Sequence, residues 1–214
     1  MQARLNATLR ATLAGVPVVP VLTVDDPALA VALGRALVAG GLHVLEVTLR
    51  TPQAMTAMAA MARAVPDAIV GAGTVLTPEQ GRTAIDHGAQ FLVSPGITPR
   101  LIQAAATFEK PLLPGAATAS EAMALADLGF TMLKFFPAEP AGGVAYLKAL
   151  AAPMPAIAFC PTGGVGACNA RSYLACPNVV CVGGSWVAPA DAVAGGDWAR
   201  ITALARAALA MRGG

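Results

Sequence analysis

Short apolar runs alternate with longer amphipathic segments along almost the whole chain. The apolar runs have the length of buried strands, and the segments between them repeat apolar residues with helical spacing. Eight strands are expected, at residues 17–24, 42–49, 68–73, 90–94, 111–114, 131–136, 156–160 and 179–182. Helices are expected up to about residue 13 and at residues 27–39, 52–65, 78–87, 99–107, 119–128, 143–151, 167–174 and 197–211. This alternation predicts β-then-α units and a parallel sheet.

The junctions between strands and helices repeat a few capping patterns. Four helices are expected to begin with a capping side chain and a proline at the first helical position, at Asp26-Pro27, Thr51-Pro52, Thr77-Pro78 and Thr98-Pro99. Thr118 and Glu121 form a capping box. Helices end before Gly40-Gly41, Gly88 and Gly129, where a left-handed cap requires no side chain.

Eight such units without a linker favour one domain, residues 1–214, folded as an α/β (β/α)8 TIM barrel with an additional N-terminal helix. An open doubly wound sheet is the competing architecture. No Gly-x-Gly-x-x-Gly follows the first predicted strand, so the sequence does not favour a dinucleotide-binding sheet.

Composition narrows the choice of partners. Apolar residues make up 56% of the chain and charged residues 12%, and the net charge is only +2 with no basic cluster. We therefore expect no nucleic-acid or membrane partner, and a cytoplasmic protein. The four cysteines lie between residues 160 and 181 without a Cys-x-x-Cys pair or a nearby histidine. They are expected to be structural thiols, and no metal site is predicted.

One lysine stands out within the apolar run at residues 131–139. Lys134 is flanked by leucine and phenylalanine, whereas Lys110 and Lys148 lie in polar or amphipathic segments. Burying an ammonium without a partner is costly, so burial favours a neutral amine, the form that attacks carbonyls to give Schiff bases. The alternative is a lysine with a buried stem whose charged head reaches solvent at the strand end.

The strand at residues 42–49 carries a second charged group. Side chains alternate along a strand, so Glu46, Thr48 and Arg50 share one face, opposite the apolar Leu45 and Val47. The polar face is expected to point into the barrel and toward its mouth, where active sites of this fold lie. Glutamate there suits proton transfer, and arginine suits a substrate carboxylate. A structural Glu46–Arg50 ion pair is the alternative, but four residues along a strand span about 13 Å.

Glycine-rich turns follow several predicted strands. Gly71-Ala72-Gly73-Thr74 ends the third strand, where the threonine hydroxyl could bind a carboxylate, and Ser94-Pro95-Gly96 makes a rigid turn after the fourth. The last two strands end in Thr162-Gly163-Gly164 and Gly183-Gly184-Ser185. Their exposed backbone N–H groups could hold a phosphate at the usual phosphate position of the fold.

These groups together predict a class I aldolase acting on a phosphorylated 2-keto acid. The lysine attacks the ketone, and the resulting imine accepts electrons during C–C cleavage. The glutamate moves protons to and from the reacting atoms. This chemistry requires neither a metal nor another cofactor.

Seven motifs also carry a family resemblance: PVVPVL at 17–22, EVTLR at 46–50, GAGTVL at 71–76, SPG at 94–96, KFFPAE at 134–139, FCPTGG at 159–164 and GGSW at 183–186. With them the chain resembles the 2-keto-3-deoxy-6-phosphogluconate (KDPG) and 4-hydroxy-2-oxoglutarate (KHG) aldolases, bacterial lyases of the Entner–Doudoroff pathway. Residues 166–168 are less typical of the family. The resemblance implies pyruvate and glyceraldehyde 3-phosphate as products, and a homotrimer.

The resemblance also implies residue roles. Lys134 would form the Schiff base with pyruvate, and Glu46 would be the acid/base. The substrate-binding positions would be Arg50, Thr74, Pro95, Phe136, Thr162, Gly163, Gly164, Gly184 and Ser185. Three alternatives stay open: cleavage of the C4 epimer 2-keto-3-deoxy-6-phosphogalactonate, a sugar-phosphate isomerase or epimerase, and a catalytically silent phosphate-binding barrel.

Overall fold

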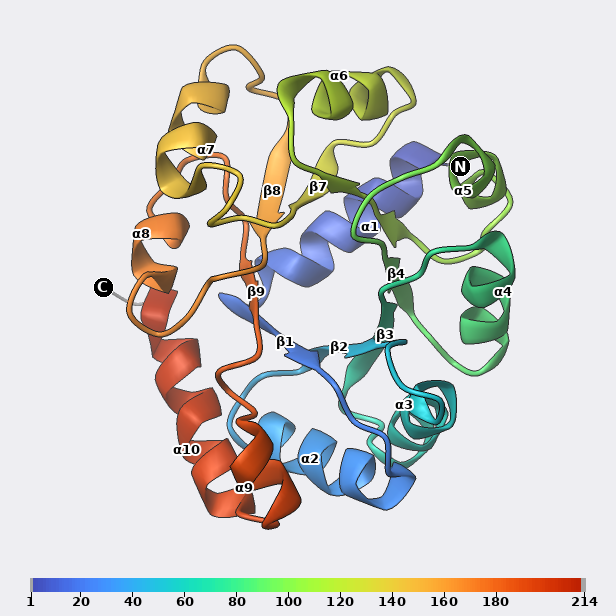
Figure 1. Cartoon of the computed structure of the whole chain (residues 1–214), viewed down its shortest axis with the longest axis vertical. Coiled ribbons are helices and arrows are strands. Elements are labelled where there is room, and N and C mark those ends of the chain that lie inside the picture. Colours follow the sequence, from blue (N-terminus) through green and yellow to red (C-terminus); the bar gives the residue numbers. More distant parts are fainter. Residues whose placement is uncertain (1, 213–214) are drawn as a thin grey trace.

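The computed structural model describes residues 2–212, in which strands lie at the centre and helices surround them (Figure 1). The strands are β1 (Val18–Leu22), β2 (Val44–Thr48), β3 (Ile69–Gly73), β4 (Phe91–Val93), β5 (Leu112–Leu113), β6 (Gly115–Ala116), β7 (Met132–Phe135), β8 (Ala158–Pro161) and β9 (Val182–Gly184). The helices are α1 (Gln2–Ala14), α2 (Pro27–Ala39), α3 (Ala54–Ala64), α4 (Pro78–Asp86), α5 (Pro99–Ala105), α6 (Ala119–Asp127), α7 (Gly143–Ala151), α8 (Ala170–Leu174), α9 (Ala190–Ala194) and α10 (Trp198–Leu209), followed by the 3-10 turn Ala210–Arg212.

The strands of the described chain form two parallel sheets. One has the order β5-β4-β3-β2-β1-β9 and the other the order β6-β7-β8. Isolated parallel bridges join Phe159 to Val179 and Thr162 to Gly183, so β8 also lies beside the segment that leads into β9. The expected parallel α/β fold is confirmed.

The strand predicted at residues 111–114 is wrong in detail. The structure has two short strands, of which β5 pairs with β4 and β6 pairs with β7. Pro114 separates them, and proline cannot donate a ladder hydrogen bond. The last strand lies later than the predicted 179–182 and includes Gly183 and Gly184, and the short helix α9 was not predicted.

Most predicted helix starts are confirmed. Asp26 and Thr98 accept hydrogen bonds from the first turns of α2 and α5, and Thr77 and Thr118 form capping boxes at α4 and α6. The cap predicted at Thr51 is wrong, because α3 begins only at Ala54 without a side-chain cap. The carboxylate of Asp25, from the preceding loop, instead accepts the backbone N–H of Gln53 at 2.8 Å.

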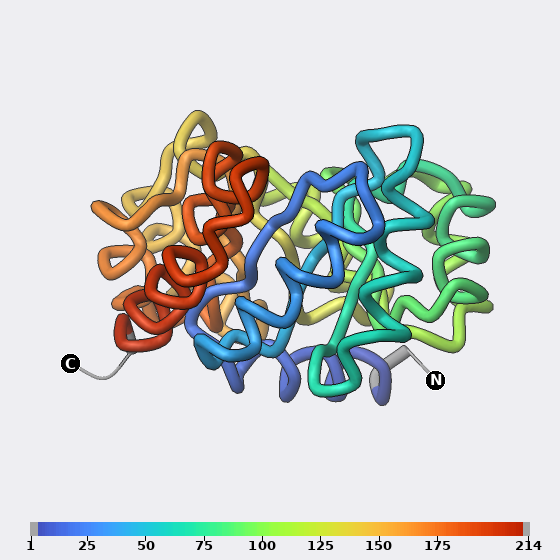
Figure 2. Tube along the Cα trace, turned by 90° about the horizontal axis from the view of Figure 1, so that it is seen from below, coloured from blue at the N-terminus to red at the C-terminus, as the bar shows by residue number. Residues whose placement is uncertain are grey.

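Apolar residues pack on both sides of the strands. Leu45 and Val47 of β2 belong to the large core between strands and helices, whereas Val44 belongs to a second core inside the strands. Leu9 and Leu13 of α1 complete this inner core. Figure 2 shows α1 lying across one end of the molecule. That end is therefore closed by apolar packing.

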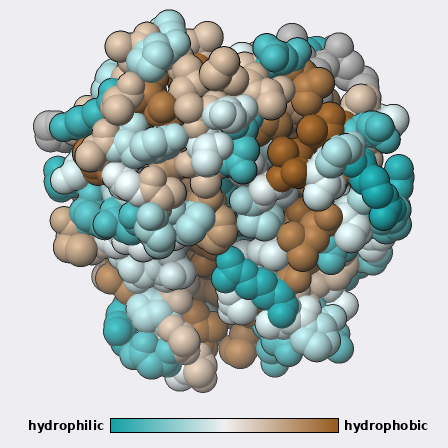
Figure 3. All heavy atoms as spheres, turned by 45° about the horizontal axis from the view of Figure 1, so that its top comes forward, coloured by the Kyte–Doolittle hydropathy of each residue, from teal (hydrophilic) through white to brown (hydrophobic). Residues whose placement is uncertain are grey.

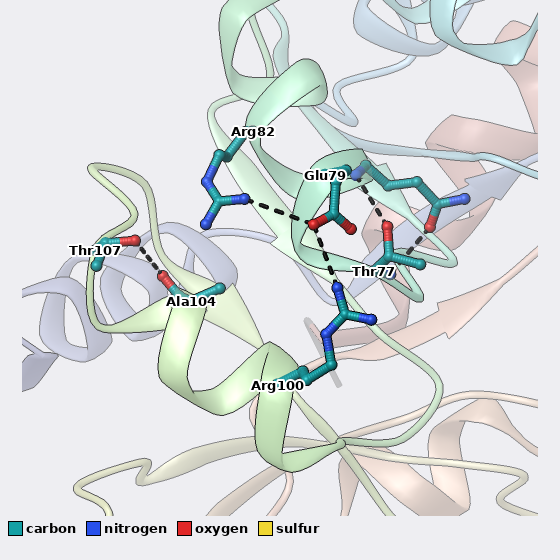
Figure 4. Close-up of polar contacts among 7 residues, drawn as sticks. Thr77, Glu79, Arg82, Arg100, Ala104 and Thr107 are labelled. Carbon is teal, nitrogen blue, oxygen red and sulfur yellow. Dashed lines mark hydrogen bonds and ion pairs between the residues drawn. The ribbon is translucent and has the colours of Figure 1, made fainter.

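Loops and helix starts form the rim at the opposite end. Glu79, at the start of α4, pairs with Arg82 at 3.9 Å and with Arg100 of α5 at 3.4 Å (Figure 4). All three side chains are mostly exposed, so these pairs contribute little to stability. Within residues 2–212, no helix has the length and apolar character required to cross a membrane.

Candidate active site

A buried ion pair lies inside the strands. Lys134 of β7 places its Nζ 3.1 Å from Oε1 of Glu46 on β2, and both side chains are only 4% exposed. The alternative of a lysine head reaching solvent is therefore wrong. The alternative of a Glu46–Arg50 ion pair is also wrong, because Glu46 pairs with the lysine. A buried amine held against a carboxylate can pass a proton to it directly.

Gly73 of β3 leaves the space that the Glu46 carboxylate of this pair occupies. β2 and β3 pair in a register that sets Thr48 beside Gly73. A Cβ atom at Gly73 would lie 2.2 Å from Oε1 of Glu46, so any side chain there would displace the carboxylate. Phe136, just after β7, places its ring centre 5.4 Å from the Nζ of Lys134.

A polar pair lies at the ends of β2 and β3. The Nε of Arg50 donates to Oγ1 of Thr74 at 3.2 Å. Thr74 has a φ of 57°, in the left-handed region that a β-branched residue rarely adopts. Strained backbone of this kind collects at functional sites. The structure thus brings together two residues that the sequence placed in separate motifs.

A cavity of about 290 Å³ opens beside these groups. Seven predicted positions line it: Arg50, Phe136, Thr162, Gly163, Gly164, Gly184 and Ser185. Thr162 is buried, and its Oγ1 has no hydrogen-bond partner among the described residues. A buried hydroxyl without a partner is costly to the fold, and here it borders a cavity where a ligand could satisfy it.

Two predicted positions lie next to the cavity lining rather than in it. Thr74 is hydrogen-bonded to Arg50, which does line the cavity. The carbonyl of Pro95 lies so close to Gly115 that a Cβ there would be 2.2 Å from it. Gly115 in turn pairs with Lys134 between β6 and β7. Pro95 therefore packs against the strand that neighbours the lysine.

Sequence reasoning missed three lining residues, Val21, Thr23 and Val165; a fourth, Gly183, belongs to the turn expected to bind phosphate but was not named as a binding position. Thr23 directly follows β1, so the rule applied to the other strand ends could have found it. Its hydroxyl lies 3.1 Å from that of Thr48, which itself donates to the carbonyl of Leu22. Thr48 is thus turned toward β1.

Other features of the described chain lie apart from this site. A larger hollow of about 570 Å³ between α2 and α10 includes none of the residues discussed above. No group of three or more histidine, cysteine or acidic side chains within residues 2–212 could hold a metal ion. Cys160, Cys176 and Cys181 are buried, as expected of structural thiols, but Cys168 is exposed, in the loop before α8.

A parallel α/β fold with a buried lysine–glutamate pair inside its strands, and a cavity at their carboxyl ends, defines an enzyme of the Schiff-base aldolase class. Residues 9–204 match the family model described as KDPG and KHG aldolase. The chain belongs to this aldolase family, which confirms the resemblance found in the motifs.

Known proteins agree with this assignment. The "KHG/KDPG aldolase" of Escherichia coli (strain K12) is 53% identical over 193 residues, covering 90% of this chain and 91% of the relative. A crystal structure of KDPG aldolase from Legionella pneumophila, with pyruvate captured as a covalent carbinolamine intermediate, superposes with a TM-score of 0.91 at 46% identity, covering 94% of this chain and 97% of that one. The KDPG aldolase of Zymomonas mobilis ZM4 with 3-phosphoglycerate gives a TM-score of 0.88 at 47% identity, covering 94% and 95%.

Proposed function

We propose that this protein is a class I aldolase that cleaves 2-dehydro-3-deoxy-6-phosphogluconate to pyruvate and glyceraldehyde 3-phosphate. The observation that carries the proposal is the contact of 3.1 Å between the buried Lys134 Nζ and Glu46 Oε1. A lysine in this setting can lose its proton to its partner and attack the substrate ketone at C2. The Legionella relative, with its covalent carbinolamine, supports the same chemistry here.

The steps follow from the two side chains. Addition of the Lys134 amine to C2 gives a carbinolamine, and loss of water gives an iminium ion. Removal of the proton from the C4 hydroxyl breaks the C3–C4 bond, and its electron pair passes into the iminium to give an enamine and the aldehyde. Protonation of the enamine at C3 and hydrolysis release pyruvate. Glu46 accepts and returns the protons, and the iminium takes the place of a metal or other cofactor as electron acceptor.

The remaining site residues divide between the two ends of the substrate. Arg50 and Thr74 bind the carboxylate, for which a guanidinium and a hydroxyl are suitable donors. Thr162 donates its free hydroxyl to the bound keto acid, and Phe136 and Pro95 wall the site. The carboxylate end thus lies close to Lys134.

The phosphate lies on the glycine loops. Gly163, Gly164 and Gly184, with Ser185, line the cavity at the ends of β8 and β9 and offer N–H and hydroxyl donors to an anion. The Zymomonas relative with 3-phosphoglycerate supports a phosphate site in this family. Cleavage of unphosphorylated 4-hydroxy-2-oxoglutarate is a second activity, favoured by the family description, which includes KHG aldolase.

Further proposals concern the architecture. Residues 1–214 form one domain, and its strands close into a (β/α)8 barrel. The parallel bridges Phe159–Val179 and Thr162–Gly183, together with the short step from β5 to β6, support this closure.

We also infer a homotrimer, as in the family. Leu76 and Met123 are 54% and 59% exposed, and Figure 3 shows apolar residues gathered in patches on one face. Light scattering should give three times the 21.4 kDa mass of the chain.

A cytoplasmic location and a role in the Entner–Doudoroff pathway complete the proposal. The free thiols of Cys160, Cys168 and Cys176 suit a reducing compartment.

The decisive test is intact mass spectrometry after incubation with pyruvate and borohydride, followed by peptide mapping. The expected result is one reduced pyruvate on Lys134, with no adduct in Lys134→Ala. Cleavage assays with the two C4 epimers then establish the stereochemical preference. A folded wild-type protein without the adduct would contradict the aldolase mechanism and favour a sugar-phosphate isomerase.

A further inference from the structure

The glycine loop after β8, which carries Gly163 and Gly164, is hydrogen-bonded to the segment after β7. The backbone N–H of Ala138 donates to the carbonyl of Thr162 at 2.8 Å, and that of Glu139 donates to the carbonyl of Gly163 at 3.0 Å. The segment that follows the Lys134 strand therefore supports the loop that carries Gly163 and Gly164.

The side chain of Glu139 extends this support. Gly164 has a φ of 80°, and a Cβ there would lie 2.5 Å from Cγ of Glu139, so the glutamate stem packs directly on the glycine. Oε1 of Glu139 accepts hydrogen bonds from Nδ2 of Asn169, at 3.2 Å, and from the hydroxyl of Tyr173. Asn169 also donates to the carbonyl of Gly164 at 3.1 Å and accepts the N–H of Gly166 at 2.8 Å.

Tyr173 is a buried partner of Glu139, so breaking the hydrogen bond between them costs free energy. Its side chain is fully buried on α8. Burial, together with the hydrogen bond to Glu139, raises the pKa of the Tyr173 phenol well above its usual range, so the hydroxyl remains a donor. Without the carboxylate, a buried hydroxyl would lose its acceptor and the loop would lose the contact that holds it.

We propose that Glu139 is a positioning residue that holds Gly163 and Gly164 in their phosphate-binding conformation, together with Asn169 and Tyr173. It thereby determines the preference for phosphorylated over unphosphorylated 2-keto acids, an inference that rests on the proposed function. Among the described residues, the two glycines line the cavity, but Glu139, Asn169 and Tyr173 do not. They act on the substrate only through the loop.

Glu139→Ala tests the proposal with a phosphorylated substrate and with 4-hydroxy-2-oxoglutarate, a shorter 2-keto acid that ends in a carboxylate and has no phosphate. The value of kcat/KM for 2-dehydro-3-deoxy-6-phosphogluconate should fall about tenfold or more, mainly through KM, because the loop loses the hydrogen bonds of Glu139 to Asn169 and to the buried Tyr173. The inhibition constant of inorganic phosphate should rise by a similar factor. Cleavage of 4-hydroxy-2-oxoglutarate, and borohydride trapping of pyruvate, should stay within about twofold of the wild type, since neither compound carries a phosphate for the glycine loop to bind.

Three further variants serve as controls. Glu139→Gln keeps the length and an acceptor oxygen and should restore most of the lost affinity for phosphate. Glu79→Ala removes a rim carboxylate that contacts Arg82 and Arg100 instead, and should change neither substrate (Figure 4). Tyr173→Phe removes only the hydroxyl and should show a smaller loss with the same substrate bias, and it decides the question if Glu139→Ala does not fold.

Equal losses on both substrates, or no loss on either, would overturn the inference. The proposed function is tested separately by the wild type. If the wild-type protein traps no pyruvate on Lys134, the proposed function fails. If it traps pyruvate but the Glu139 and Tyr173 variants treat both substrates alike, only the role of Glu139 fails.

Discussion

At the scale of single residues, Lys134 and Glu46 lie in contact but have different proposed roles. Lys134 forms the Schiff base and Glu46 transfers protons, and the two steps can be measured independently. Glu46→Gln keeps the shape of the side chain but removes its capacity to accept a proton. Turnover should fall about 100-fold or more, in line with the usual contribution of a general acid/base. Some imine should still form, because Lys134 remains in place. Steady-state kinetics and borohydride trapping on one preparation measure both quantities, and undiminished turnover would exclude Glu46 as the acid/base.

Thr162 allows a second test, because its hydroxyl is buried yet has no partner within the described chain. Thr162→Val removes the hydroxyl at nearly constant shape. The melting temperature should change by only a few degrees, since no internal hydrogen bond is lost, while kcat/KM should fall about tenfold from one lost substrate contact. Thr162→Ser, which keeps the hydroxyl, should retain most of the activity. A large loss of stability without a kinetic effect would identify the hydroxyl as structural.

Strand alternation predicted that Glu46 faces inward, because it shares a face with Thr48 and Arg50, and the apolar run around Lys134 indicated that this lysine is buried. Neither pattern could predict that the two side chains meet, since Glu46 and Lys134 are 88 residues apart and their approach depends on how the strands are arranged. The contacts of Glu139 were missed for the same reason. Its partners Asn169 and Tyr173 lie 30 and 34 residues away and have no motif spacing.

At the scale of elements, caps made by residues next to a helix were predictable from the sequence, but contacts supplied by distant segments were not. Thr77 and Thr118 cap their own helices, so a few adjacent residues suffice to recognise them. The turn before α3 is held by Asp25, 28 residues before Gln53, which no local pattern reveals. Likewise, the break between β5 and β6 follows from which strand each half pairs with.

The two capping boxes differ in charge, which gives a pH test. Glu121 accepts the N–H groups of Ala117 and Thr118, and these hydrogen bonds, chiefly the one from Ala117, lower its pKa in the folded state. Its stabilisation is therefore fully present above the unfolded pKa of about 4.3 and is lost as pH falls through the folded value. Glu121→Ala should cost up to about 1 kcal/mol at pH 7, a difference that shrinks toward pH 3.

The neutral box at α4 is the matched control for that test. Gln80 accepts the N–H groups of Leu76 and Thr77 at 2.7 and 3.2 Å. Gln80→Ala should cost a similar amount, but with no change between pH 7 and pH 3, because an amide does not titrate in this range. Urea unfolding of the three proteins at several pH values gives the comparison. Parallel pH profiles for both variants would show that the charge of Glu121 contributes nothing.

At the scale of the whole molecule, stability and chemistry lie at opposite ends of the strands. Leu9 of α1 is 1% exposed and packs into the inner core at the closed end, while the glycine loops and Arg50 lie at the other. Leu9→Ala should therefore lower the free energy of unfolding by about 2–5 kcal/mol, because it opens a cavity in a packed core. The folded fraction should still trap pyruvate on Lys134 as the wild type does. Leu128→Ala, at a position 48% exposed, should cost much less and serves as the control in urea unfolding. Loss of trapping in fully folded Leu9→Ala would mean that the inner core transmits strain to the lysine, and that the two ends are not independent.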